Sequence, residues 1–299
     1  MPAIIGSIIL IAVFVFFSWQ GPANSRPAKV EIIEHHIPIR LVDVKLPEIK
    51  AMSVVTLDSE SGARLLDYKA DERRSLASLT KLMTAMVFLE TAPDWDKKIV
   101  ILKQDIQSDN KPNIFVDDEI NLRDLFTISL MASDNTATTA LVRSTGLTNQ
   151  AFTELMNNKV KQLRLAAYFI EPTGLDAGNQ GTALSVAKMI ERAYKYPEIE
   201  QALKFYHYTF KVSQQITRRA TSTNQLIGRS LPAGAKMLIG KTGHLNEAGY
   251  CFAGVFETKG KKIITVILGS SQADNRFIDT INILDWTLGA YLWENNSDK

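Results

Sequence analysis

Cysteine and histidine are scarce in this chain, and neither sign of charge prevails. Cys251 is the single cysteine among 299 residues, so an internal disulfide framework is excluded. The four histidines show no metal-ligand spacing beyond one adjacent pair, and we therefore expect no metal site; they stand at positions 35, 36, 207 and 244. With 34 basic and 32 acidic residues the net charge is +2, which gives no basic surface for nucleic acid. Cys251 lies in a strand-like run, and we expect it to be a small buried hydrophobe.

Long apolar runs are also absent, with one exception at the N-terminus. Residues 4–19 carry no charge and almost only apolar side chains. A membrane helix needs about 20 such residues, so this run is slightly short, and it lacks the basic flank of a secretory signal. We expect residues 1–20 to be a signal-anchor or signal peptide, with the rest of the chain in the cell envelope outside the cytoplasmic membrane. Arg26 and Lys29 follow the run, which the positive-inside rule does not favour. Glycine and repeated prolines then predict a linker over residues 21–50.

The stretch Ser78-Leu79-Thr80-Lys81 begins a run with helical spacing of apolar residues, at positions 79, 82, 83, 86 and 87. Three residues of separation place Ser78 and Lys81 on one face, and the run is apolar nearly all round, which predicts burial. Ser78 alone could be an N-cap, but a capping box would then have Glu or Gln at position 81. The helix dipole opposes a cation there by roughly 0.3–1 kcal/mol. Burial and the dipole both disfavour the charged form of the Lys81 amine. A neutral amine beside the Ser78 hydroxyl is what a serine nucleophile needs as its base.

The order of the remaining elements indicates an α+β fold. Residues 52–57 and 63–68 flank a turn and predict a β-hairpin. Helices follow, one capped by Asn121 and others over residues 135–146, 148–163 and 185–196. Strands return over residues 237–243, 248–257 and 263–269, and an amphipathic helix from Phe277 to Leu292 closes the pattern. One antiparallel sheet made from both chain ends, flanked by helices and interrupted by a helical insertion, fits this order. We expect a catalytic body over residues 51–293 and a polar tail over residues 294–299.

Two further triplets support a catalytic interpretation of the Ser78 motif. Ser133-Asp134-Asn135 at a helix junction would ordinarily be read as a cap, and Lys241-Thr242-Gly243 on a strand as an edge protected by a lysine. In this order and context, however, S-x-x-K, S-D-N and K-T-G form the set found in penicillin-binding proteins and class A β-lactamases.

Longer strings carry a more specific likeness, which runs from about Ala51 to Trp286. The chain resembles the low-molecular-mass penicillin-binding proteins, the serine D-alanyl-D-alanine carboxypeptidase and endopeptidase family. The strings are Ala77–Thr84, Glu171–Leu175, Gly240–His244 and Glu247–Tyr250. The resemblance implies a β-lactamase/transpeptidase-like fold, peptidoglycan stem peptides as substrate, covalent binding of β-lactam antibiotics such as penicillin, and no cofactor.

The resemblance also implies roles for individual residues. Ser78 matches the nucleophile that forms an acyl-enzyme with the penultimate D-alanine, and Lys81 matches its general base. Ser133 matches the hydroxyl that relays a proton to the leaving amine. The other matches concern the substrate: Asn135 its amide, Lys241 and Thr242 its carboxylate, and the backbone N–H groups of Ser78 and His244 its oxyanion. The edge of the Lys241 strand can pair with an extended peptide, and Gly243 removes a side chain that would block close approach.

Three alternatives remain open at this stage. A class A β-lactamase shares the triplets and needs a carboxylate for deacylation, which Glu171-Pro172 superficially supplies; the Thr173-Gly174-Leu175 string after it favours the peptidase. A DD-endopeptidase that cleaves peptidoglycan cross-links has the same motifs, while His244 after Lys-Thr-Gly looks more like the carboxypeptidases. An inactive penicillin-binding scaffold has no support, because every motif position holds a chemically competent residue.

Overall fold

The computed structural model describes residues 37–41, 44–107, 112–213 and 215–293. The predicted N-terminal segment over residues 1–20 and the polar tail over residues 294–299 lie outside these residues. In the part of the chain that is described, no helix is both long enough and apolar enough to cross a membrane.

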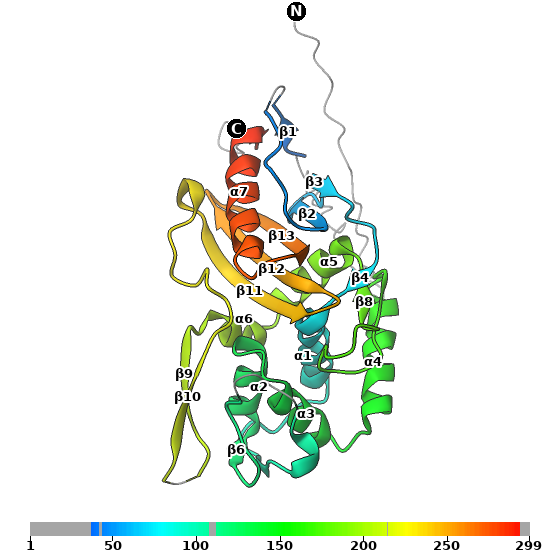
Figure 1. Ribbon diagram of the computed structural model, residues 1–299, viewed down its shortest axis with the longest axis vertical. Helices are drawn as coiled ribbons and strands as arrows, with labels where there is room; N and C mark the ends of the chain where they lie inside the picture. Colours follow the sequence, from blue (N-terminus) through cyan, green and yellow to red (C-terminus); the bar gives the residue numbers. More distant parts are fainter. Residues whose placement is uncertain (1–36, 42–43, 108–111, 214, 294–299) are drawn as a thin grey trace, which may run out of the picture.

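The central sheet is antiparallel and is made from both ends of the chain, as the sequence predicts (Figure 1). Its strands, in spatial order, are β11 (Lys236–Leu245), β12 (Gly249–Thr258), β13 (Lys261–Ser270), β2 (Ser53–Asp58) and β3 (Arg64–Tyr68). Side chains alternate between the two faces of β12, because successive strand residues point to opposite sides. Phe252 and Phe256 join one buried cluster, whereas Cys251 and Val255 join the other. Cys251 is thus a buried core residue, as expected.

Helices cover both faces of this sheet. The helices of the described chain are α1 (Lys81–Glu90), α2 (Leu122–Met131), α3 (Asn135–Ser144), α4 (Asn149–Gln162), α5 (Ala183–Tyr194), α6 (Pro197–Lys204) and α7 (Asn275–Ala290). Helix α7 packs on β12 and β13, and α5 packs on the same strands from the other side. Helices α2, α3 and α4 form the predicted helical insertion below the sheet in Figure 1. Helix α1 lies between the two, and it is buried from Lys81 to Phe88.

The helix starts follow from local capping. The side chains of Asn121, Asp134, Thr148 and Thr182 accept hydrogen bonds from backbone N–H groups in the first turns of α2, α3, α4 and α5. Each such bond satisfies a donor that has no partner inside the helix. The predicted cap at Asn121 is therefore confirmed, and the predicted helix boundaries fall within a few residues of those observed.

Short strand pairs occupy the remaining connections. They are β1 (Ile39–Arg40) with β14 (Tyr291–Leu292), β4 (Arg74–Ser75) with β8 (Gln180–Gly181), β7 (Ala167–Tyr168) with β8, β5 (Lys98–Val100) with β6 (Glu119–Asn121), and β9 (His207–Lys211) with β10 (Thr217–Thr221). The sequence predicts neither α6 nor the β9–β10 hairpin. Strand β1 lies within the segment predicted as a linker, so part of that segment joins the folded body.

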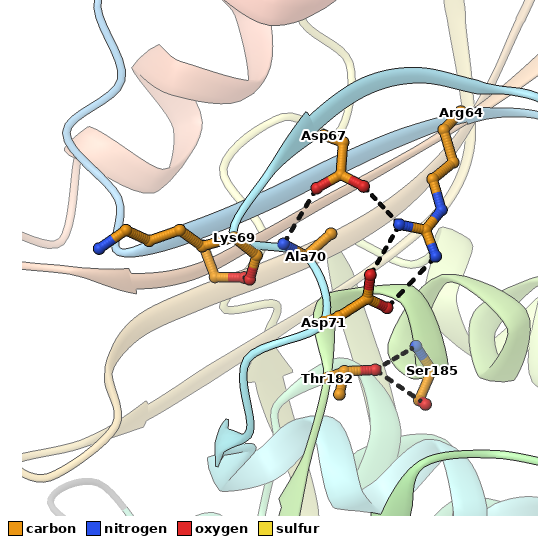
Figure 2. A network of polar contacts seen from close by, with 8 residues as sticks. Arg64, Asp67, Lys69, Ala70, Asp71, Thr182 and Ser185 are labelled. Atoms are coloured by element: carbon orange, nitrogen blue, oxygen red, sulfur yellow. Dashed lines mark hydrogen bonds and ion pairs between the residues drawn. The ribbon is translucent and has the colours of Figure 1, made fainter.

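The connection from β3 toward α1 is fastened by charged side chains (Figure 2). Arg64 on β3 forms ion pairs with Asp67 and Asp71, and Asp67 accepts a hydrogen bond from the backbone N–H of Ala70 at 3.2 Å. The carbonyl of Ala70 in turn accepts from Leu184 N in α5 at 3.2 Å. These contacts hold the connection between β3 and α5. The chain then continues into the 3-10 turn Ala77–Thr80, called the Ser78 turn below.

Candidate active site

Ser78 and Lys81 meet where the Ser78 turn passes into α1. Lys81 Nζ lies 3.0 Å from Ser78 Oγ, so the two side chains share one face as their spacing predicts. Lys81 is only 1% exposed, and the Ser78 turn packs directly against β11. The pair therefore lies at the start of α1, the helix that Figure 1 shows between the sheet and the helical insertion.

The Lys81 amine is surrounded by oxygens that can accept its hydrogen bonds. Lys81 Nζ also lies 2.5 Å from Asn135 Oδ1 and 2.6 Å from the carbonyl oxygen of Thr173. Both oxygens can only accept hydrogen bonds, whereas a serine hydroxyl can donate or accept. A neutral amine has two N–H donors and one lone pair. In the structure Nζ is placed to donate to all three oxygens. To take the hydroxyl proton of Ser78, the amine must first lose a proton, and the two oxygens of Asn135 and Thr173 can then still accept its two remaining N–H groups.

The Ser133-Asp134-Asn135 motif spans the junction of α2 and α3. Ser133 has a φ of 59°, a left-handed conformation that is uncommon for a residue with a side chain. Asp134 caps α3 through the N–H of Ala137, and its carboxylate also binds the side chain of Asn113. The motif thus anchors a loop and directs its flanking side chains in different directions: Asn135 reaches Lys81, while Ser133 reaches Lys241.

Strand β11 forms the edge of the sheet and carries the Lys241 motif. Lys241 Nζ donates to Ser133 Oγ at 2.8 Å and to the carbonyl of Thr242 at 2.8 Å. The Thr242 hydroxyl forms a hydrogen bond with Thr223, a residue that the sequence does not single out. Two contacts therefore bring the three motifs together: Lys81 with Asn135, and Lys241 with Ser133.

Gly243 allows a close approach, but to the protein itself. A Cβ atom added at Gly243 would lie 3.1 Å from the carbonyl oxygen of Leu76 and 3.3 Å from the backbone nitrogen of Leu79. The sequence suggested that this glycine makes room beside the strand edge. The structure shows that its lack of a side chain lets β11 pack against the Ser78 turn.

Arg276 is a further charged residue of this region that the motifs do not reveal. It is the second residue of α7, is 8% exposed, and donates to the carbonyl of Gly243 at 3.0 Å. Its guanidinium lies over the ring of Tyr250, which in turn stacks on His244 with ring centroids 4.0 Å apart. Burial and the charge of Arg276 lower the pKa of His244, which favours a neutral imidazole. Only the sheet topology brings Arg276 here, since no local pattern connects it to β11.

Comparisons with known proteins agree with this geometry. The model of the peptidase S11 family, described as D-alanyl-D-alanine carboxypeptidase, matches residues 41–272. The chain belongs to this family. It is 29% identical over 248 residues to the D-alanyl-D-alanine endopeptidase of Escherichia coli K12, covering 80% of this chain and 78% of that protein. It is also 29% identical over 258 residues to the D-alanyl-D-alanine carboxypeptidase of Streptomyces sp. K15, covering 81% and 89%.

A solved structure supports the fold of this S11 peptidase. The structure of penicillin-binding protein D2 from Listeria monocytogenes in its cefotaxime-bound form superimposes with a TM-score of 0.71 at 27% sequence identity. The match covers 82% of this chain and 100% of that one. The expected α+β, β-lactamase/transpeptidase-like fold is therefore confirmed, as is the expected membership of a peptidase family.

Glu171 separates this S11 peptidase from the β-lactamase alternative. One carboxylate oxygen accepts hydrogen bonds from Thr173 N and Thr173 Oγ1, and the other accepts from Gly174 N at 2.6 Å and Asn179 Nδ2 at 2.8 Å. These donors all lie within eight residues of Glu171 in the sequence. A carboxylate engaged in this way is suited to holding the loop, whereas activation of a water molecule needs a free lone pair on the carboxylate.

Lys241, the second buried amine of the site, has a lowered pKa. Burial lowers the pKa of Lys241 well below its ordinary 10.5, and the charges of Lys81 and Arg276 lower it further. The folded chain therefore binds fewer protons than the unfolded chain between the lowered pKa and 10.5. It follows that the free energy of unfolding rises with pH across this window.

Lys241→Met is expected to stabilise the fold while removing function. The substitution eliminates a buried ammonium that is repelled by Lys81 and Arg276. Near neutral pH the free energy of unfolding should increase by on the order of 1 kcal/mol, and it should depend less on pH up to the alkaline range. Urea unfolding at several pH values measures both effects. Lys236→Met, which changes an exposed lysine of the same strand, is the control. Lower stability of Lys241→Met at neutral pH would contradict the expectation.

Proposed function

We propose that the chain is a serine-type D-alanyl-D-alanine carboxypeptidase that acts on peptidoglycan stem peptides through an acyl-enzyme on Ser78. The observation that carries the proposal is the contact of 3.0 Å between Lys81 Nζ and Ser78 Oγ, with Asn135 and Thr173 accepting from the same amine. A buried amine within hydrogen-bond distance of a hydroxyl can, in its neutral form, act as a general base without a metal or another cofactor.

In the first step, Lys81 Nζ takes the hydroxyl proton of Ser78 while Ser78 Oγ forms a bond to the carbonyl carbon of the penultimate D-alanine. The π electrons of that carbonyl move to its oxygen, where the backbone N–H groups of Ser78 and His244 stabilise the negative charge. The carbonyl then re-forms and the C–N bond breaks. The leaving nitrogen takes the hydroxyl proton of Ser133, and Ser133 recovers the proton that Lys81 had taken from Ser78, so Lys81 is neutral again; Lys241 already bonds to the Ser133 hydroxyl.

In the second step, water replaces the departed D-alanine. Lys81 takes a proton from the water as its oxygen bonds to the acyl carbon. The tetrahedral intermediate then releases Ser78 Oγ, which recovers a proton from Lys81. The same two groups therefore serve acylation and deacylation, which agrees with the engagement of the Glu171 carboxylate by its own loop.

Substrate recognition follows from the strand edge and the charges beside it. An extended peptide can add to the outer edge of β11 through backbone hydrogen bonds. Lys241 and Thr242 are assigned to the terminal carboxylate of the peptide, and the buried charge of Arg276 behind Gly243 raises the positive potential at this end. Asn135 is assigned to the substrate amide, and its Oδ1 is already fixed by Lys81. We further propose that β-lactams acylate Ser78, in line with the cefotaxime-bound state of the similar Listeria protein.

A second candidate activity is cleavage of peptidoglycan cross-links. It is favoured by the name of the E. coli relative, an endopeptidase, whereas the Streptomyces relative and His244 favour the carboxypeptidase. Either activity belongs outside the cytoplasm, where the family's cell-wall substrate lies. We propose that residues 1–20 anchor the folded body, residues 51–293, to the outer face of the cytoplasmic membrane.

Mass analysis of muropeptides digested with the full chain tests the two activities. A carboxypeptidase removes one D-alanine from monomeric pentapeptides and leaves cross-linked dimers intact. An endopeptidase converts dimers to monomers. We expect loss of the terminal D-alanine that is blocked by prior incubation with penicillin. No change in either substrate would overturn the proposed function.

A further inference from the structure

The loop Glu171–Asp176 brings a backbone carbonyl to the catalytic amine. The carbonyl oxygen of Thr173 lies 2.6 Å from Lys81 Nζ, and the Thr84 hydroxyl of α1 donates to the carbonyl of Pro172 at 2.6 Å. Gly174 has a φ of 86°, and a Cβ atom there would lie 2.1 Å from the carbonyl oxygen of Ala77. The loop is therefore pressed against the Ser78 turn, and only glycine fits at its point of closest approach.

The carboxylate of Glu171 lies at the centre of this loop and determines its shape. Its two oxygens together accept from Thr173 N, Thr173 Oγ1 and Gly174 N, all within 2.6 Å. Two of these donors are the peptide N–H groups on either side of the Thr173 carbonyl. Hydrogen bonds to an ionised acceptor are shorter and stronger than neutral ones. The orientation of that carbonyl is consequently fixed by Glu171.

Asn179 joins the same network to the Ser78 turn. Its Nδ2 group donates to Glu171 Oε1 at 2.8 Å and to Thr80 Oγ1 at 3.2 Å, and its Oδ1 accepts from Ile170 N at 2.7 Å. Its carbonyl accepts from Leu76 N at 2.9 Å. Asn179 is fully buried. Loop, turn and amine therefore form one hydrogen-bonded unit, with the nucleophile at one end and Glu171 at the other.

From this geometry we infer that Glu171 is a positioning residue for the acylation step, acting on Lys81 through the Thr173 carbonyl. It exchanges no proton with the substrate. Its carboxylate holds the carbonyl that accepts from Lys81 Nζ at 2.6 Å, and this contact keeps the amine 3.0 Å from Ser78 Oγ. The inference rests on the proposed function of Ser78 and Lys81, and it assigns a role to a carboxylate whose position after the second motif otherwise resembles a deacylating base.

Glu171→Gln tests the inference with little change in volume. Whichever way the carboxamide is turned, its NH₂ group faces the N–H of Thr173 or of Gly174, so the carbonyl of Thr173 must rotate away. Displacement of a catalytic group by about 1 Å costs roughly a hundredfold in rate. In stopped-flow labelling with a fluorescent penicillin, we expect the first-order acylation constant to fall about a hundredfold. The dissociation constant of the preceding noncovalent complex should stay within about threefold, and deacylation should not become selectively slow.

Asp176→Asn is the matched control, because it removes a carboxylate from the same loop while keeping an acceptor for Gly178 N. It should acylate at the wild-type rate. The final labelled fraction distinguishes a rate effect from misfolding: a folded Glu171→Gln protein labels slowly but completely, whereas partial unfolding lowers the final fraction at an unchanged rate.

The remaining outcomes overturn one proposal or the other. Wild-type acylation in Glu171→Gln, or a reduced final fraction at the wild-type rate, would refute the positioning role and leave the proposed function intact. Normal acylation with slow deacylation would make Glu171 a hydrolytic base instead. Absence of labelling in the wild-type protein would refute the proposed function itself.

Discussion

Ser78→Ala is expected to abolish both covalent labelling by penicillin and hydrolysis of D-alanyl-D-alanine peptides. The variant removes the oxygen to which the acyl group bonds, so no residual acyl-enzyme can form. Lys81 loses only its 3.0 Å contact with Ser78 and retains Asn135 and Thr173, so the fold should be nearly unaffected. Intact-protein mass spectrometry after incubation with penicillin detects the acyl adduct directly.

Ser75→Ala provides the control for this substitution. Ser75 lies three residues earlier, is buried, and its hydroxyl has no hydrogen-bond partner among the described residues. This variant should label at the wild-type rate. An acyl adduct of normal mass on Ser78→Ala would place the nucleophile elsewhere and would remove the basis of the proposed mechanism.

Lys81→Arg is expected to reduce acylation by about a thousandfold or more, within the range for loss of a general base. A guanidinium keeps its proton at any pH compatible with the fold, so it has no lone pair for the Ser78 proton. Its planar group must also fit between Asn135 Oδ1 and the Thr173 carbonyl in a site where the native side chain is 1% exposed. Labelling kinetics over a range of pH should show no alkaline recovery.

Lys159→Arg is the matched control for Lys81→Arg. Lys159 in α4 is likewise buried, but it forms an ion pair with Glu90 and lies outside the site. An arginine can satisfy that carboxylate, so acylation should stay near the wild-type rate. Near-normal acylation by Lys81→Arg would exclude Lys81 as the base and would require another group to take the proton.

Much of the fold is predictable because the responsible signals are local. The cap of α2, the hairpin of β2 and β3, and the long strands near the C-terminus each follow from a few adjacent residues. The same is true of the contact between Ser78 and Lys81, which three residues of helical spacing determine. In contrast, α6 and the β9–β10 hairpin lie in a stretch of mixed polar and aromatic residues. Apolar residues there follow neither the helical spacing of 3.6 nor the strand spacing of 2.

The rest of the site depends on contacts between residues far apart in the sequence. Lys241 meets Ser133 across 108 positions, and only the edge location of β11 brings them together. The Thr173 carbonyl is a backbone group, so residue types alone could not mark it as a partner of Lys81. Arg276 reaches the site because β12, β13 and α7 fold back behind β11. A buried cation at the start of an apolar helix is the one signal that could have drawn attention to it.

The interleaving of early and late strands in the central sheet has a consequence for biogenesis. Strand β13 is the neighbour of β2, so the first hairpin of the body stays unpaired on one edge until about two hundred further residues have emerged. Contacts of such high sequence separation form slowly, because loop closure precedes any gain from pairing. A partly synthesised or partly exported chain therefore presents Ser78 without the strand that completes its surroundings. Ser78 of such a chain could not be acylated by its substrate before β11 is in place, and the open strand edges would need protection from aggregation in the meantime.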